Sequence, residues 1–236
     1  MIDSLLLSKH LSDYLSSLQP DLPDFLEGLY ERAREERIPV IRREAQSLLR
    51  FLCLDREPGR VLEIGTAIGF SSCFMAEYLP AGAVIDTVEK DPERHRIAEE
   101  NIVAFAADYK NRRGGEAPSV HAANEDAEAF LSGLVSEGRK YDLIFLDAAK
   151  AQYPVYLEYI EKLMTRRSVL ITDNILQEGT LADSKFTVTR RDRTIHLRMR
   201  EFADELFRSG RFDSLLLPLG DGMTVTRLSG GNGGKS

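Results

Sequence analysis

Residues 60–72 read RVLEIGTAIGFSS, and this stretch decides the fold class. The apolar run RVLEI leads into a turn that contains Gly65 and Gly69, and the turn leads into a helical segment, FSSCFMAEYL. A strand that passes through a glycine-containing turn into a helix is typical of an open α/β sheet, where ligands bind at the carboxyl ends of the strands. We therefore predict such a sheet, with a ligand site at this turn.

The same alternation of apolar runs and helical segments continues along the chain. Further apolar runs occupy residues 83–89, 119–123, 141–147 and 168–174, with a helical segment between each pair. Strands that alternate with helices predict a parallel sheet covered on both faces. The runs at 212–219 and 223–228 are separated by GDG and predict an antiparallel hairpin. The predicted fold is α/β, a Rossmann-like doubly wound sheet of seven mostly parallel strands with that hairpin at its end.

The predicted domain organisation is simple. A chain of 236 residues with 43% hydrophobic content can bury one large core, so we predict a single domain over residues 1–228. Apolar residues at helical spacing predict two or three helices over about 2–54, before the sheet begins. The last residues, 229–236, read SGGNGGKS and are predicted to form a flexible tail.

Charge and cysteine content limit the possible classes of protein. A net charge of −7 argues against a protein that coats nucleic acid by charge alone, although local basic patches are still possible. Cys53 and Cys73 lie in apolar segments and are predicted to be buried, reduced thiols. No secretory or membrane-spanning segment is visible in the sequence, so we expect a cytoplasmic protein.

The ends of the first three predicted strands indicate a cofactor. The spacing Gly65-x-x-x-Gly69 is not the dinucleotide fingerprint and lacks a P-loop lysine, which weakens both nucleotide interpretations. Glu63 could bind an α-amino group and Glu89 could accept hydrogen bonds from ribose hydroxyls. A ligand with a ribose, an amine and no phosphate is S-adenosylmethionine. Asp126, followed by Ala127, could receive its adenine amino group, or could be an ordinary acid at a helix N-terminus.

The ends of the next two predicted strands carry oxygen ligands. Asp147 ends the fourth strand, and Asp173 and Asn174 end the fifth. Two carboxylates and an amide favour Mg²⁺ or a similar divalent cation, although each acid alone could simply cap a helix or loop. Lys150 lies three residues after Asp147 and is a candidate general base if the cation and desolvation lower its pKa; a surface lysine is the alternative.

Taken together, VLEIGTAIGFSS, FLDAAKAQY, VLITDN and GDGMTVTRL resemble the cation-dependent class I O-methyltransferases, which include catechol and caffeoyl-CoA O-methyltransferases. The resemblance covers about residues 38–228. It implies that Asp147, Asp173 and Asn174 hold Mg²⁺, that Lys150 and Asp147 are catalytic, and that the protein forms a homodimer. It also implies a set of residues that line the S-adenosylmethionine site, namely Ile41, Glu63, Gly65, Thr66, Gly69, Ser71, Glu89, Asp126, Ala127 and Asp147.

The acceptor must offer two adjacent oxygens to a cation, as catechols and 5-hydroxyuridine both do. DAAKAQY most resembles the bacterial tRNA 5-hydroxyuridine methyltransferases, and Tyr153 or Phe186 could stack on a base. Two groups of basic residues could hold tRNA phosphates, or could be a solvated face with acidic neighbours. These groups are Arg32, Arg34, Arg37, Arg42 and Arg43, and Arg190, Arg191, Arg193, Arg198 and Arg200.

The favoured hypothesis is therefore Mg²⁺-dependent methylation of 5-hydroxyuridine at the wobble position of the tRNA anticodon, giving 5-methoxyuridine. The second is O-methylation of a small catechol-like or phenolic molecule. The third is a protein of another class, which binds S-adenosylmethionine without catalysis.

Overall fold

The computed structural model describes residues 14, 17–176, 179, 181 and 193–230. These residues form two compact units, one that ends at Phe130 and one that begins at Leu131. The single domain over residues 1–228 stays a prediction.

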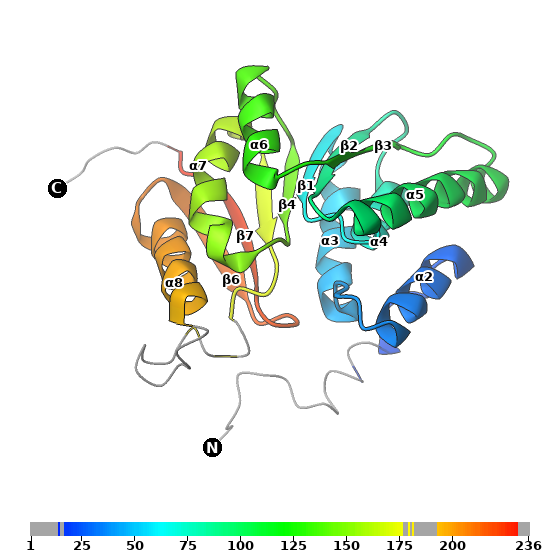
Figure 1. Ribbon diagram of the computed structural model, residues 1–236, viewed down its shortest axis with the longest axis horizontal. Coiled ribbons are helices and arrows are strands. Elements are labelled where there is room, and N and C mark those ends of the chain that lie inside the picture. Colours follow the sequence, from blue (N-terminus) through cyan, green and yellow to red (C-terminus); the bar gives the residue numbers. More distant parts are fainter. Residues whose placement is uncertain (1–13, 15–16, 177–178, 180, 182–192, 231–236) are drawn as a thin grey trace. The chain divides into compact units, whose positions relative to one another are not determined.

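The first unit holds three parallel strands in the order β3-β2-β1 and the helices that follow or precede them (Figure 1). Val61, Leu62 and Ile64 of β1 are completely buried, as expected for a strand of a parallel sheet with both faces covered. The elements are α2 (Asp24–Glu35), α3 (Arg43–Arg56), β1 (Arg60–Ile64), α4 (Phe70–Tyr78), β2 (Val84–Glu89), α5 (Pro92–Arg113), β3 (Ser119–Asn124) and the start of α6 (Ala127–Ser136).

Local sequence explains where the long helix α5 begins and ends. The Asp91 carboxylate accepts hydrogen bonds from the backbone N–H groups of Glu93 and Arg94, both at 3.0 Å, and Pro92 occupies the first turn. At the other end Gly114 adopts the left-handed conformation, with φ of 71°. The helix therefore starts immediately after β2, which fixes the end of β2 at Glu89.

In the second unit, parallel strands β4 and β5 are followed along the sheet by β7 and β6, which are antiparallel. The complete strand order is β3-β2-β1-β4-β5-β7-β6, which confirms the predicted seven-stranded, mostly parallel sheet with an antiparallel hairpin. The remaining elements are β4 (Leu143–Leu146), the 3₁₀ turn η1 (Lys150–Gln152), α7 (Tyr153–Leu163), β5 (Val169–Thr172), α8 (Arg193–Arg208), β6 (Phe212–Leu217) and β7 (Met223–Leu228).

Some boundaries differ from those predicted. The strands expected at 141–147 and 168–174 are shorter, because the chain leaves the sheet before Asp147 and Asp173. Most of the first predicted helix, before residue 17, lies outside the described residues. Of the predicted flexible tail, Ser229 is hydrogen-bonded, since its N–H donates to the Arg211 carbonyl at 2.8 Å, and residues 231–236 are not described.

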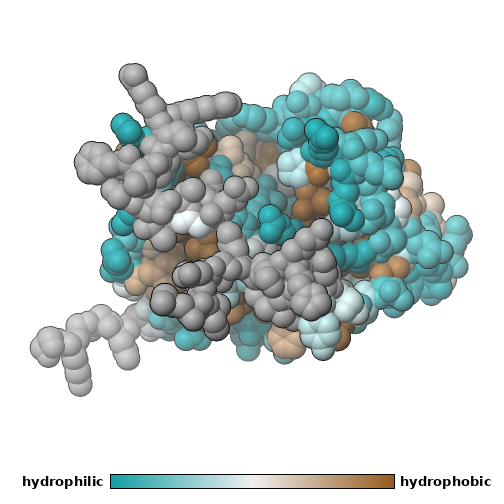
Figure 2. Space-filling model, turned by 90° about the horizontal axis from the view of Figure 1, so that it is seen from below, coloured by the Kyte–Doolittle hydropathy of each residue, from teal (hydrophilic) through white to brown (hydrophobic). Residues whose placement is uncertain are grey.

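The two cysteines are buried and unbridged, as predicted. Burial raises the pKa of the Cys53 thiol to about 12, so this thiol is not a reactive nucleophile at neutral pH. Within the described part of the chain, no helix has the length and apolar character needed to cross a membrane. Where it is coloured, the face in Figure 2 is mostly hydrophilic, with hydrophobic residues in small separate groups.

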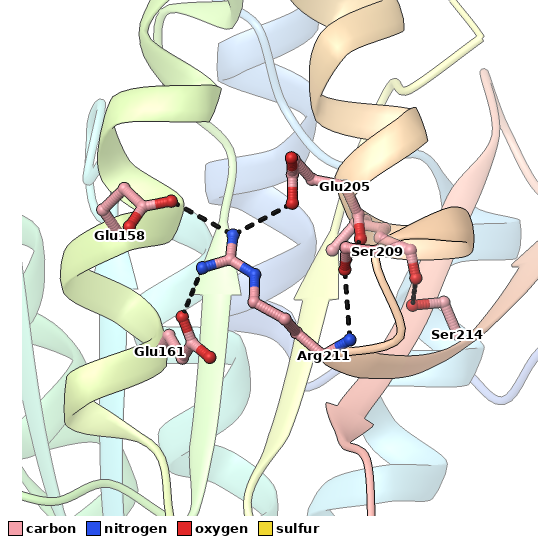
Figure 3. Close-up of polar contacts among 7 residues, drawn as sticks. Glu158, Glu161, Glu205, Ser209, Arg211 and Ser214 are labelled. Carbon is pink, nitrogen blue, oxygen red and sulfur yellow. Dashed lines mark hydrogen bonds and ion pairs between the residues drawn. The ribbon is translucent and has the colours of Figure 1, made fainter. Parts of the chain in front are cut away.

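Arg211, just before β6, ties two helices of the second unit together (Figure 3). Its guanidinium donates to Glu161 of α7 at 2.7 Å, to Glu158 of α7 at 3.1 Å and to Glu205 of α8 at 3.1 Å. The Arg211 side chain is about one-third exposed, at 32%, so solvent screens part of the attraction. A network of this kind is nevertheless worth more than an isolated surface pair, because one cation serves three carboxylates.

We predict that Arg211→Ala lowers the free energy of unfolding by about 1 kcal/mol after the discount for screening. The matched control is Arg208→Ala, which removes a single exposed pair with Asp204 and should change stability by less than about 0.5 kcal/mol. Urea unfolding of both variants measures the difference. Equal small losses would mean that the network adds nothing beyond its separate pairs.

Candidate functional sites at the strand ends

The turn after β1 is built on three residues with positive φ. Gly65, Ala67 and Gly69 have φ of 105°, 49° and 83°, and the N–H groups of Gly65 and Thr66 both donate to the Val88 carbonyl, at 3.1 and 3.2 Å. A Cβ on Gly69 would lie 3.3 Å from the backbone oxygen of Ala98, so a side chain there would crowd α5 as well as strain the backbone. The predicted ligand turn is therefore held against the end of β2.

Glu63 is completely buried beneath this turn. Its carboxylate accepts hydrogen bonds from the hydroxyls of Ser71 and Ser72, and from that of Thr87 at 2.6 Å. Thr87 in turn shares a 2.6 Å hydrogen bond with the hydroxyl of Thr66. Glu63 thus connects β1, β2 and the start of α4, and its predicted contact with an amino group stays a prediction.

Glu89 ends β2 and holds the turn from the other side. One carboxylate oxygen accepts from the Ala67 N–H and the other from the Asp91 N–H, both at 3.0 Å. The Glu89 backbone carbonyl accepts from the Asn124 side chain at 2.8 Å and from the Glu125 N–H at 3.3 Å, so the ends of β2 and β3 are joined. Glu89 is partly exposed, and its predicted contact with ribose hydroxyls stays a prediction.

Two other predicted cofactor residues have structural explanations of their own. The Asp126 carboxylate accepts from the Glu128 N–H at 3.0 Å, the cap geometry that the alternative interpretation expected, and Ala127 is the first residue of α6. Ile41 is buried, and its carbonyl accepts from the Gln46 side chain at 2.8 Å. Their contacts with a cofactor stay predictions.

Asn101 is a supporting residue that the sequence reasoning missed. It is buried on α5, and its side chain donates to the Ile68 carbonyl in the turn and accepts from the Arg32 guanidinium, each at 2.8 Å. Asn101 lies three residues after Ala98 and four before Phe105, which are both buried. An amide on the buried face of a helix requires a partner, and that requirement was the available signal.

In the second unit the structure brings Asp147, Lys150 and Asp173 together, as predicted. The Lys150 ammonium donates to the Asp147 carboxylate at 2.9 Å, to the Asp173 backbone carbonyl at 3.0 Å and to the Tyr153 hydroxyl at 2.6 Å. Asn174 follows with φ of 55°, and its N–H donates to the Asp173 carboxylate at 2.7 Å. The ends of β4 and β5 thus share one polar cluster.

The surroundings of Asp173 and Lys150 raise the pKa of both side chains. Burial first, and then the charge of Asp147, raise the pKa of Asp173 to about 7, and the Lys150 ammonium only partly opposes this. Burial lowers the pKa of Lys150, but the Tyr153 hydroxyl and the Asp147 carboxylate outweigh it, so the net shift is upward. Without a cation Lys150 is therefore a charged donor, and the lowering of its pKa that a bound cation would bring stays a prediction.

Tyr153 is completely buried, which corrects its predicted role as a surface for base stacking. Its hydroxyl donates to the Leu146 carbonyl at 3.1 Å, and its ring packs edge-on against Phe202 at 5.2 Å between centroids. Tyr153 therefore anchors the lysine instead of facing a substrate. Phe186, Arg190 and Arg191 lie outside the described residues.

Asp221, between β6 and β7, is a second residue that the sequence reasoning missed. It is buried, and its charge is among the influences that raise the pKa of Asp173. Among the described residues, no cluster of three or more His, Cys, Asp or Glu side chains could hold a metal ion. The candidate set has two carboxylates and the Asn174 amide, which is still a set of oxygen donors suited to a divalent cation.

Several predicted phosphate-binding arginines are engaged within the chain. Besides the contact of Arg32 with Asn101, Arg34 pairs with Glu31 at 3.2 Å and Arg198 with Glu201 at 3.0 Å. Arg43 likewise pairs with Glu27. These contacts agree with the alternative of a face with acidic neighbours.

A family model, curated relatives and a solved structure all indicate the same protein family. The family model described as O-methyltransferase matches residues 17–229. A catechol O-methyltransferase of Niastella koreensis is 31% identical over 59% of this chain and 58% of its own length, and a caffeoyl-CoA O-methyltransferase of Stellaria longipes is 27% identical over 78% and 73%. The structure of an SAH-bound methyltransferase from Podospora anserina superposes with a TM-score of 0.75 and 26% identity, covering 93% of this chain and 94% of that one.

The raised pKa of Asp173 leads to a prediction about stability and pH. Because the folded protein holds this proton more tightly than the unfolded chain, ionisation destabilises the fold as pH rises from about 4 to about 7. Asp173→Asn keeps the acceptor for the Asn174 N–H but cannot ionise. In the presence of chelator, its stability advantage over the wild type should grow across this range to the order of 4 kcal/mol and then level off.

Thermal unfolding at a series of pH values measures this advantage. Asp204→Asn, at an exposed position on α8, is the control and should give a nearly constant difference. An advantage of Asp173→Asn that is also independent of pH would show that Asp173 ionises normally.

Proposed function

Because the chain belongs to the O-methyltransferase family, we propose that it transfers the methyl group of S-adenosylmethionine to a hydroxyl oxygen, with a divalent cation such as Mg²⁺ at Asp147, Asp173 and Asn174. The observation that carries this proposal is the cluster at the ends of β4 and β5, where Lys150 contacts both Asp147 and Asp173. In an open α/β sheet, ligands bind at the carboxyl ends of the strands, which is where these carboxylates lie.

The chain's own side chains fit a cation at this position. Asp173 is buried, and Asp147 is near enough for its charge to disfavour ionisation of Asp173. One lysine does not balance the two carboxylates, so a hard cation with oxygen ligands would supply the missing positive charge. When bound, such an ion lowers the pKa of a coordinated hydroxyl and orients it toward the methyl donor.

We propose the β1–α4 turn and the end of β2 as the cofactor site. Gly65 is partly exposed and has no side chain, so a ligand can approach its backbone, and Glu89 offers carboxylate oxygens for ribose hydroxyls. Gly69 instead lets the turn pack against Ala98 of α5. Glu63 acts by holding the Ser71 and Ser72 hydroxyls at the start of α4. The SAH-bound relative from Podospora anserina supports this assignment.

Lys150 is proposed to act on the acceptor oxygen. Its three hydrogen bonds fix the ammonium beside Asp147, where it can stabilise negative charge that develops on the hydroxyl. Proton removal by Lys150 requires its raised pKa to fall. Drawing the Asp147 carboxylate away from Lys150 would remove one of the two groups that hold the pKa up.

For the acceptor, we propose a small catechol-like or phenolic molecule with two adjacent oxygens. The relatives named for catechol and caffeoyl-CoA support this class. The alternative is 5-hydroxyuridine in the tRNA anticodon, which offers an equivalent pair of oxygens. It is favoured by the exposed Arg37, Arg42 and Arg193, whereas the internal contacts of Arg32, Arg34 and Arg43 weaken it. A homodimer and a cytoplasmic location belong to the same proposal.

The test of activity uses purified protein, S-adenosylmethionine with a labelled methyl group, and Mg²⁺. We expect label in catechol or caffeoyl-CoA, and more than about 100-fold less product with chelator or in Asp173→Asn. Product only in tRNA that carries 5-hydroxyuridine would move the assignment to the alternative acceptor. Cofactor binding without product on any acceptor would support the non-catalytic class.

A separate prediction concerns Lys150. Lys150→Ala should lower kcat by about 100-fold or more, because the acceptor oxygen loses its positive neighbour, while the Kd for S-adenosylmethionine changes less than about 3-fold. Lys162→Ala, on the exposed side of α7, is the matched control and should retain wild-type kcat. Single-turnover rates and calorimetric titration give the two quantities. Equal losses in kcat and cofactor affinity would make Lys150 a structural residue.

A further inference from the structure

The turn between β6 and β7 is fastened to the segment that follows β5. The Ile175 N–H donates to the Gly222 carbonyl at 3.0 Å, and the Leu176 N–H donates to the Asp221 carbonyl at 2.9 Å. The turn is itself closed by a 2.9 Å hydrogen bond from the Gly222 N–H to the Leu219 carbonyl. Two backbone bonds therefore secure the chain immediately after Asn174.

Gly222 has no room for a side chain. Its φ is +85°, and a Cβ there would lie 2.8 Å from Cδ1 and 3.1 Å from Cβ of Leu176, with Cγ closer still. Leu176 would have to move, and its N–H is one of the two groups that bind the turn. The absence of a side chain at Gly222 is thus a condition for this pair of hydrogen bonds.

Asn174 is the residue that these bonds constrain. Its φ of 55° is left-handed, a conformation that asparagine adopts more readily than most residues with a Cβ. On one side the Asn174 N–H is bound by the Asp173 carboxylate at 2.7 Å, and on the other the next N–H is bound by Gly222. Just before Asp173, the hydroxyls of Thr172 in β5 and Thr224 in β7 share a hydrogen bond of 2.5 Å.

We infer that Gly222 is a positioning residue for the candidate cation site: the turn of Leu219–Gly222 fixes Ile175 and Leu176, and thereby sets the backbone of the ligand Asn174. This inference rests on the proposed function, because it presumes that the cation binds at Asp147, Asp173 and Asn174. Residues that orient ligands without touching the ion commonly change metal affinity by about 10–100-fold when altered.

The test measures Mn²⁺ binding by electron paramagnetic resonance on the full chain. Gly222→Ala should bind Mn²⁺ about 10–100-fold more weakly than the wild type, and its Ile175 and Leu176 amides should exchange hydrogen faster. The matched control is Gly210→Ala, since Gly210 also has positive φ, +76°, but a Cβ there meets nothing within 4 Å. Gly210→Ala should change the affinity by less than about 3-fold.

A double-mutant cycle with Leu176→Ala tests the cause of the loss. Leu176→Ala removes Cγ and Cδ1 and so makes room for the methyl group that Gly222→Ala introduces. Gly222→Ala should therefore weaken Mn²⁺ binding much less in the Leu176→Ala protein than in the wild type. Equal losses in both backgrounds, or an unchanged affinity of Gly222→Ala, would overturn the inference. If Gly222→Ala does not fold, Leu176→Pro carries the test, because proline removes the N–H that binds the Asp221 carbonyl; wild-type Mn²⁺ affinity in that variant would contradict the inference.

Failure of the proposed function gives a different result. If the wild-type protein and Asp173→Asn bind Mn²⁺ equally weakly, the cation site itself is wrong and the inference falls with it. If the wild type binds Mn²⁺ and Gly222→Ala binds it equally well, the cation site stands and only the role of Gly222 is wrong.

Discussion

The polar end of the second unit depends on the hydrogen bonds made by the ammonium of Lys150, whose side chain is 15% exposed. A charge taken out of water is costly unless partners satisfy it, and here one carboxylate, one backbone carbonyl and one hydroxyl do so. These partners come from the end of β4, the end of β5 and the start of α7. The lysine therefore holds together the strand end that carries Asp147 and the strand end that carries Asp173.

In the first unit, the buried Glu63 carboxylate at the end of β1 is stabilised by hydroxyl groups. The hydroxyls of Ser71, Ser72 and Thr87 all donate to the Glu63 carboxylate. Hydroxyl groups satisfy the carboxylate without adding a charge, so Glu63 fixes the geometry of the β1–α4 turn. At the ends of β4 and β5, by contrast, two carboxylates lie beside one lysine, and their mutual repulsion raises the pKa of Asp173.

Sequence periodicity was sufficient for the fold and for the approximate ends of the strands, because apolar runs and their glycine-containing turns are local features. RVLEI and MTVTRL were predicted to the residue, and Asp147 and Asp173 were correctly placed at strand ends. The pKa of Lys150 could not be predicted, since it depends on Tyr153, whose hydroxyl folds back under β4. Asn101 was missed for a similar reason, because its partners, Ile68 and Arg32, are remote in sequence.

The antiparallel hairpin determines which turn lies beside the end of β5. In a parallel pair the carboxyl ends of both strands lie at one edge, whereas β7 brings its amino end, and the turn before it, beside the carboxyl end of β5. Backbone carbonyls of Asp221 and Gly222 are therefore available to bind the N–H groups that follow Asn174. Reversal of this one strand thus places the Leu219–Gly222 turn next to the residues that carry the oxygen ligands and binds it to them through the backbone.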